Sequence, residues 1–236
     1  MAVGHLDDMK KAVAIIQVRT TSSRLRNKAL LCLNGKTLIE NVIHQAKQIS
    51  EANEVWVATS TETEDDIIAI LCEELSIKCY RGSLQDVRSR FIEIAELSQA
   101  EIILRITGDN PLTNPHYGNQ LIKYLKNHPE VDYVRMDKSA IIDGTGSEAF
   151  HTKAFLESVN RYSDITSIEH VTTPFLMNEK RIHQVQPSEN MRAEGKLFVG
   201  IDTMEDYRNA RKLFKKLGSN PELNSIIKFL KNEKTI

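Results

Sequence analysis

The architecture of this chain follows from Val13-Ala-Ile-Ile-Gln-Val18 and the residues directly after it, Arg19-Thr-Thr-Ser-Ser-Arg24-Leu-Arg-Asn-Lys28. The first six residues predict a buried strand, and the next ten hold four cations, four hydroxyl side chains and no acid. Cationic side chains, hydroxyl groups and the backbone N–H groups of a turn are the donors that bind phosphate. A strand that runs into such a loop therefore predicts a site for a polyphosphate, with a solvated basic loop as the alternative.

The positive charge of this loop is local. The chain has 236 residues, 41% of them hydrophobic and 27% charged, and its formal net charge is -1. This composition is that of a soluble globular protein with a substantial core. Nucleic-acid binders more often carry a basic excess or a long basic face, so the sequence favours an anionic small molecule as the partner.

The cysteines and the apolar stretches bear on the cellular compartment. The three cysteines, Cys32, Cys72 and Cys79, form no C-x-x-C pair, which argues against a disulfide framework or a zinc site. No signal-peptide pattern occurs, and no apolar stretch is long enough to span a bilayer. We therefore expect a cytoplasmic protein, with residues 1–11 as a loose leader.

Strand and helix patterns alternate along the first two-thirds of the chain. Strands are predicted at 13–18, 54–59, 77–80, 101–106 and 131–134, and helices at 36–49, 63–75, 85–97 and 114–126. Strands separated by helices pair in parallel, which predicts an α/β fold with a three-layer, doubly wound, mostly parallel sheet. Ligands of such sheets bind at the carboxyl ends of the strands.

The segment 136–196 breaks this alternation. It contains a Gly144-Thr-Gly146 turn, helices expected at 153–160 and 165–177, and a strand expected at 181–186. A strand at 197–201 and helices at 204–217 and after Pro221 then resume the pattern. The sequence thus predicts a single domain over 12–236, in which 136–196 is an inserted flap.

Two aspartates are placed to hold a metal ion. Asp109 follows a predicted strand in Arg105-Ile-Thr-Gly-Asp109, and Asp202 follows another in Gly200-Ile-Asp202. Mg²⁺ prefers carboxylate oxygens together with substrate phosphates. Turn formation before Asn-Pro is the alternative for Asp109, and Asp206 is expected to cap a helix with Thr203. Two such carboxylates beside a cationic loop would form a metal-assisted phosphoryl or nucleotidyl transfer site.

The common phosphate-binding fingerprints are absent, since neither G-x-x-x-x-G-K-[ST] nor G-x-G-x-x-G occurs. In their place, the chain resembles the cytidylyltransferase family that makes CMP-activated acidic sugars. The nearest variety is the spore-coat-polysaccharide-synthesis type, related to the 3-deoxy-manno-octulosonate and acylneuraminate cytidylyltransferases. The family pattern A-R-x-x-S-x-R-L-P-G-K is matched at Arg19, Ser22, Arg24, Leu25 and Lys28. Further similar segments lie at 55–59, 81–91, 105–112, 169–172 and 200–206.

This resemblance implies a glycosyltransferase-A-like nucleotidyltransferase fold that binds CTP and Mg²⁺ and assembles as a homodimer through the inserted segment. It also assigns roles to residues. The triphosphate would be held by Arg19, Ser22, Arg24 and Lys28, the metal by Asp109 and Asp202, the nucleotide also by Asp86 and Arg90, and the acceptor by Glu148 and His170. The expected catalytic set is Arg24, Lys28, Asp109 and Asp202.

Two departures from the family pattern concern the loop and the acceptor. Arg26-Asn27 stands where Pro-Gly is usual, and Gly146 stands where a D-G-L-D-x-E pattern has its second aspartate. The resemblance implies transfer of CMP from CTP to an acidic sugar or a phosphorylated small molecule, for surface polysaccharide or glycoconjugate precursors. A non-catalytic nucleotide- or sugar-binding relative and a glycosyltransferase on the same fold are the alternatives, although the chain has no Asp-x-Asp motif.

Overall fold

The computed structural model describes residues 10–161, 170–177, 181–193 and 197–233. Its strands are β1 Ala12–Gln17, β2 Cys32–Leu33, β3 Lys36–Thr37, β4 Glu54–Ser60, β5 Lys78–Gly82, β6 Ile102–Thr107, β7 Tyr133–Met136, β8 Glu148–His151 and β9 Ile182–Val185. Its α-helices are α1 Leu38–Ala46, α2 Asp66–Glu74, α3 Val87–Ser98, α4 Pro115–Asn127, α5 Thr152–Arg161, α7 Thr173–Leu176, α8 Met204–Leu217 and α9 Leu223–Glu233.

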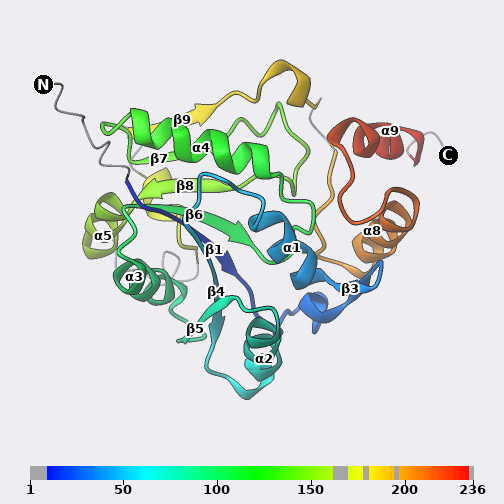
Figure 1. Ribbon diagram of the computed structural model, residues 1–236, viewed down its shortest axis with the longest axis horizontal. Coiled ribbons are helices and arrows are strands. Elements are labelled where there is room, and N and C mark those ends of the chain that lie inside the picture. The colour runs from blue at the N-terminus through cyan, green and yellow to red at the C-terminus, as the bar shows by residue number, and fades with distance from the viewer. Residues whose placement is uncertain (1–9, 162–169, 178–180, 194–196, 234–236) are drawn as a thin grey trace, which may run out of the picture.

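One seven-stranded sheet, in the order β5-β4-β1-β6-β8-β7-β9, forms the middle of the molecule (Figure 1). All neighbouring strands pair in parallel except β8, which is antiparallel to both β6 and β7. Helices cover both faces, as the clusters of buried residues show. The expected α/β fold with a mostly parallel, three-layer sheet is confirmed.

The alternation of side chains along β1 explains the three layers. Ala12, Ala14 and Ile16 pack into one core with α1 and α4, whereas Val13 and Ile15 pack into a second core with α3 and α5. Successive side chains of a strand point to opposite faces, so a continuous apolar run requires a cover on both. The run at the start of the chain therefore places β1 in the middle of the sheet.

Local signals begin the helices where the sequence places them. Thr37 and Glu40 form a reciprocal capping box at the start of α1. Asn114 caps α4 through the N–H of His116, with Pro115 at the first helical position. These caps satisfy N–H groups that have no partner within the helix.

Three sequence predictions differ from the structure. Strand β8 was not predicted, although it lies between β6 and β7. Residues 197–201 are extended but form only an isolated bridge, in which Phe198 pairs with Asp143. The helix expected from residue 63 begins at Asp66, after a 3-10 turn, and its Ile67 and Ile70 are 45% and 51% exposed.

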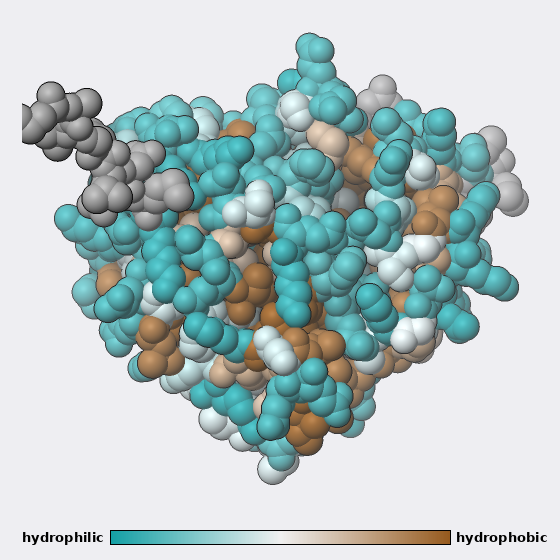
Figure 2. All heavy atoms as spheres, viewed as in Figure 1, coloured by the Kyte–Doolittle hydropathy of each residue, from teal (hydrophilic) through white to brown (hydrophobic). Residues whose placement is uncertain are grey.

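The segment 136–196 is continuous with the sheet, since β8 and β9 both belong to it. The helix expected at 165–177 appears as α7 over its last part, and residues 162–169 lie outside the described residues, as do residues 1–9 of the expected leader. Polar residues cover most of the face in Figure 2, and hydrophobic residues show through at its lower end, where α2 lies. Within the described ranges, every helix is too short or too polar to cross a membrane.

Candidate active site

The cationic loop is anchored at its start by a buried carboxylate. Asp65 accepts hydrogen bonds from the backbone N–H and the hydroxyl of Thr20, both at 2.7 Å, and from the N–H of Ser60 at 3.1 Å. Burial raises the pKa of Asp65, but these hydrogen bonds outweigh it and hold the pKa below its ordinary value. Asp65 therefore ties the residue after Arg19 to the end of β4.

The turn before Lys28 uses an unusual backbone conformation. Asn27 has φ 54° and ψ 24°, in the left-handed region that favours glycine. Asparagine tolerates this region better than other non-glycine residues do. Asn27, at the position where the family pattern has glycine, therefore keeps the turn, and a short 3-10 helix from Lys28 to Leu30 follows it.

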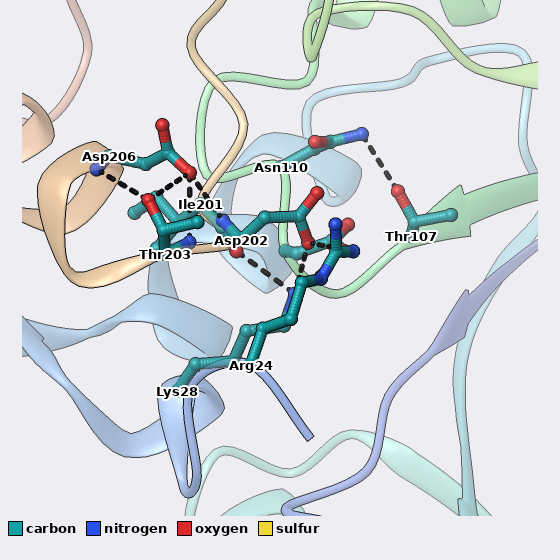
Figure 3. Close-up of polar contacts among 9 residues, drawn as sticks. Arg24, Lys28, Thr107, Asn110, Ile201, Asp202, Thr203 and Asp206 are labelled. Atoms are coloured by element: carbon teal, nitrogen blue, oxygen red, sulfur yellow. Dashed lines mark hydrogen bonds and ion pairs between the residues drawn. The ribbon is translucent and has the colours of Figure 1, made fainter. Parts of the chain in front are cut away.

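Lys28 joins the two predicted metal ligands. Its ammonium lies 3.0 Å from an oxygen of Asp109, 2.9 Å from an oxygen of Asp202 and 2.9 Å from the carbonyl of Ile201. Arg24 adds a second ion pair to Asp202 at 3.0 Å. Figure 3 shows Arg24 and Lys28 side by side, with both head groups at Asp202.

Asp202 reaches the site on an extended segment that packs against two loops. Asp143 exchanges backbone hydrogen bonds with Leu197 and Val199, and the N–H of Ile201 donates to the carbonyl of Asp109 at 3.0 Å. The approach is close, since a Cβ on Gly144 would lie 2.4 Å from the nitrogen of Gly200. These contacts place two aspartates that are distant in sequence around one cation.

The segment ends in the cap that the sequence predicts. Thr203 and Asp206 form a capping box at the start of α8, and Asp206 also accepts from the N–H of Asp202 (Figure 3). Asp206 is thus committed to the helix, whereas Asp202 faces the loop cations.

A cavity of about 320 Å³ opens beside this cluster at the carboxyl ends of β1 and β6. Seven of the predicted site residues line it, namely Arg19, Ser22, Arg24, Lys28, Arg90, Asp109 and Asp202. Asp86 is not among the lining residues, and its carboxylate instead caps α3 by accepting from the N–H of Ser89. We call this space the first cavity.

Arg90 is the deepest cation of the first cavity. Its side chain is 1% exposed and it donates to the carbonyl of Ala58 at 3.4 Å. Burial lowers the pKa of Arg90, and the neighbouring carboxylate of Asp65 partly offsets that shift. A buried guanidinium at the wall of an open cavity favours an anionic ligand.

A second cavity of about 130 Å³ adjoins the first and shares Arg105 and Thr107 with it. Its other lining residues are Asn110, Arg135, Met136, Lys138, Ile141, Asp143, Gly144, Gly146, Ser147 and Glu148. Glu148 is predicted from the sequence to bind the acceptor, whereas Arg105 and Arg135 have no predicted role. Arg105 could have been found from the sequence, because it begins the segment Arg105-Ile-Thr-Gly-Asp109 that resembles the family. No sequence pattern points to Arg135.

Glu148 is held by three side chains of the protein. It makes an ion pair with Arg105 at 2.6 Å and accepts from the hydroxyls of Tyr133 at 2.8 Å and Thr172 at 3.0 Å. Burial raises the pKa of Glu148, but the charge of Arg105 and the hydrogen bonds lower it by more than burial raises it. The pKa of Glu148 is therefore below its ordinary value. Its predicted acceptor role is therefore combined with a structural one.

His170, the other predicted acceptor residue, is exposed and lines neither cavity. Its carbonyl accepts from the N–H of Thr173 at the start of α7. Thr172, two residues later, reaches Glu148. The segment of His170 therefore contacts Glu148, a lining residue of the second cavity, through Thr172.

The donor set at Asp109 and Asp202 fits Mg²⁺. Two carboxylates already converge on one cation, and each has a second oxygen. Among the described residues no cluster of three or more His, Cys, Asp or Glu could hold a metal ion. A divalent ion here would therefore take its remaining ligands from water and substrate phosphates, which is the usual arrangement for Mg²⁺.

Comparisons with known proteins identify the family of this chain. A family model described as cytidylyltransferase matches residues 13–235. The uncharacterized protein MJ1063 of Methanocaldococcus jannaschii is 34% identical over 93% of this chain and 90% of its own length. The spore coat polysaccharide biosynthesis protein SpsF of Bacillus subtilis is 27% identical over 92% of each chain.

Solved structures share the fold at lower identity. A cytidylyltransferase from Leptospira borgpetersenii has a TM-score of 0.87 and 21% identity, with 96% of each chain covered. A CMP:2-keto-3-deoxy-manno-octonic acid synthetase complexed with CTP has a TM-score of 0.65 and 20% identity, over 88% of this chain and 99% of that one.

Proposed function

This chain belongs to the cytidylyltransferase family, and from that premise we propose that it transfers CMP from CTP to an acidic sugar or a phosphorylated small molecule. The products are a CMP-linked compound and pyrophosphate, in the synthesis of surface polysaccharide or glycoconjugate precursors. The observation that carries the proposal is the first cavity, where the cationic loop and both aspartates meet at the ammonium of Lys28.

The reaction needs one bond made and one broken. A hydroxyl oxygen of the acceptor attacks the α-phosphorus of CTP, the bond from that phosphorus to the α,β-bridging oxygen breaks, and the electron pair leaves with pyrophosphate. Charge grows on the leaving pyrophosphate, so cations that face it lower the barrier. Arg24 and Lys28, which line the first cavity side by side (Figure 3), would do this.

The remaining residues of the cavity orient the triphosphate. Arg19 and Ser22 would bind it from the loop, and Arg90 from the floor. Members of this family are typically metal-dependent, and we propose that Asp109 and Asp202 would hold Mg²⁺, which neutralises phosphate charge when bound. Asp86 caps α3, the helix that carries Arg90, and would thereby help to position Arg90 for the nucleotide.

Binding of the acceptor is proposed for the second cavity, beside the first. Glu148 lines this cavity. His170 is two residues before Thr172, whose hydroxyl donates a hydrogen bond to Glu148. Homodimer assembly, a cytoplasmic location and the single-domain division at 12–236 stay predictions from the sequence.

The test is the Asp109→Asn variant, which keeps the size of the side chain and removes its charge. We expect pyrophosphate release from CTP plus acceptor to fall by about 10²–10³-fold, the usual cost of losing one charge-stabilising group. Circular dichroism and the unfolding midpoint should be near those of the wild type. Near-normal turnover would refute the proposed metal site, and release of a nucleoside diphosphate from a sugar donor would indicate a glycosyltransferase.

A further inference from the structure

Three charged residues form a row across neighbouring strands. Arg105 on β6 lies opposite Glu148 on β8, and Glu148 lies opposite Arg135 on β7. Directly opposite residues of paired strands place their side chains on the same face of a sheet. The carboxylate of Glu148 is bound by Arg105 at 2.6 Å and by the hydroxyls of Tyr133 and Thr172.

Two buried polar atoms at the second cavity have no hydrogen-bond partner among the described residues, the Nε of Arg135 and the hydroxyl oxygen of Ser147. Ser147 is only 7% exposed, and both residues line the second cavity. These two atoms are closed to solvent, so a ligand in the cavity would meet other atoms of the same residues. Arg135 is half-buried, lines the second cavity and makes no side-chain hydrogen bond or ion pair with the described residues. A guanidinium that the protein leaves unpaired at a cavity favours an anionic ligand there.

The charges of the second cavity favour an anion. Arg105, Arg135 and Lys138 supply three cations, and Asp143 and Glu148 supply two acids. Because Glu148 is engaged with Arg105, the side of the cavity that carries Arg135 and Lys138 keeps an excess of positive charge. The exposed carboxylate of Asp143 remains available to accept hydrogen bonds from hydroxyl groups.

We propose that Arg135 is the residue that selects the acceptor, by binding the acceptor's carboxylate through its guanidinium. Asp143 accepts a hydrogen bond from a hydroxyl group of the acceptor, and Lys138 adds positive charge at the rim. The planar guanidinium fork matches a carboxylate better than it matches a neutral group. This inference rests on the proposed function, since the second cavity adjoins the first at Arg105 and Thr107.

The experiment uses matched variants of the full chain. Arg135→Gln removes the charge and Arg135→Lys keeps it. Gly146→Asp and Gly146→Asn impose the same steric change, a Cβ that meets the mobile end of Ile141 at 2.9 Å, and differ by one negative charge in the second cavity. Arg181→Gln is the control, because Arg181 lies outside both cavities and pairs with Asp132.

Two readouts separate this inference from the proposed function. Pyrophosphate release at saturating CTP is measured with 2-keto-3-deoxy sugar acids, their carboxamides, and sugar phosphates without a carboxylate. Calorimetry then measures how the same compounds bind the enzyme saturated with a non-hydrolysable CTP analogue. CTP binding without acceptor is recorded for each variant.

We expect the wild type to prefer an acid to its carboxamide, and Arg135→Gln to raise the acceptor KM by about 30-fold or more with CTP binding unchanged. Arg135→Lys should recover part of the loss. Gly146→Asp should weaken acceptor binding relative to Gly146→Asn, and Arg181→Gln should behave as the wild type.

Several results would overturn the inference. Equal use of acid and carboxamide, preference for a sugar phosphate without a carboxylate, or an unchanged acceptor KM in Arg135→Gln would each do so while leaving cytidylyl transfer in place. Failure of every compound to bind or to release pyrophosphate, with CTP still bound, would refute the proposed function and this inference together.

Discussion

The two adjoining cavities differ in how their charges are balanced. In the first, Lys28 neutralises Asp109 and Asp202 at about 3 Å each, and Arg24 adds a further pair. In the second, Arg105 pairs with Glu148, and the guanidinium of Arg135 has no hydrogen bond or ion pair with the described residues. Ions that the protein pairs are held in place before a ligand binds, whereas an unpaired guanidinium at a cavity favours a ligand that supplies the opposite charge.

The strongest test of this comparison is Lys28→Met, which keeps much of the side chain's length and removes the charge. Asp109 and Asp202 would then face each other without their shared ammonium, and the leaving pyrophosphate would lose a cation. We expect kcat/KM for CTP to fall by about 10²–10³-fold, with binding of the acceptor little changed. Lys36→Met, at an exposed position on β3, is the control, and a loss below tenfold would show that the ammonium is dispensable.

A second test separates structural from ligand-binding charge in the second cavity. Glu148→Gln leaves Arg105 without its carboxylate, which should lower the free energy of unfolding by about 2–3 kcal/mol at pH 7. The pKa of Glu148 is lowered in the folded state, so its contribution is present above the unfolded pKa and is lost as pH falls through the folded value.

Urea unfolding of the wild type and Glu148→Gln at several pH values measures this effect. The difference in the free energy of unfolding should be largest above about pH 4.5 and should shrink at lower pH. A difference that stays constant with pH would mean that the charge of Glu148 does not stabilise the fold.

The smallest expected effect concerns the turn that carries Lys28. Asn27→Ala should destabilise the protein by about 1 kcal/mol, because alanine pays the full cost of the left-handed conformation, whereas Asn27→Gly should be nearly neutral. Thermal unfolding compares the two variants, and KM for CTP reports whether the loop still presents Lys28. Equal stability of both variants would show that φ at this turn is not restrained.

Much of the fold was predictable because its signals are local. The apolar run at β1, the cap at Asn114 and the Thr203–Asp206 box each depend on neighbours in sequence. Strand β8 was missed because its first residue is Glu148, a charged residue that depends on Arg105 from another strand. The error at 197–201 has a similar cause, since the backbone of that apolar segment bonds to the loops at Asp143 and Asp109 and not to a strand of the sheet.

Residue type and short-range order were enough to predict the strand-to-loop transition at β1, the cations of the loop and the family. The position of Lys28 between Asp109 and Asp202 is visible only in the folded chain, since 81 and 174 residues separate Lys28 from them. The same holds for Arg135, whose proposed role depends on its register opposite Glu148 and on the pairing of Glu148 with Arg105. Pairing across a sheet is a long-range property, and no local pattern records it.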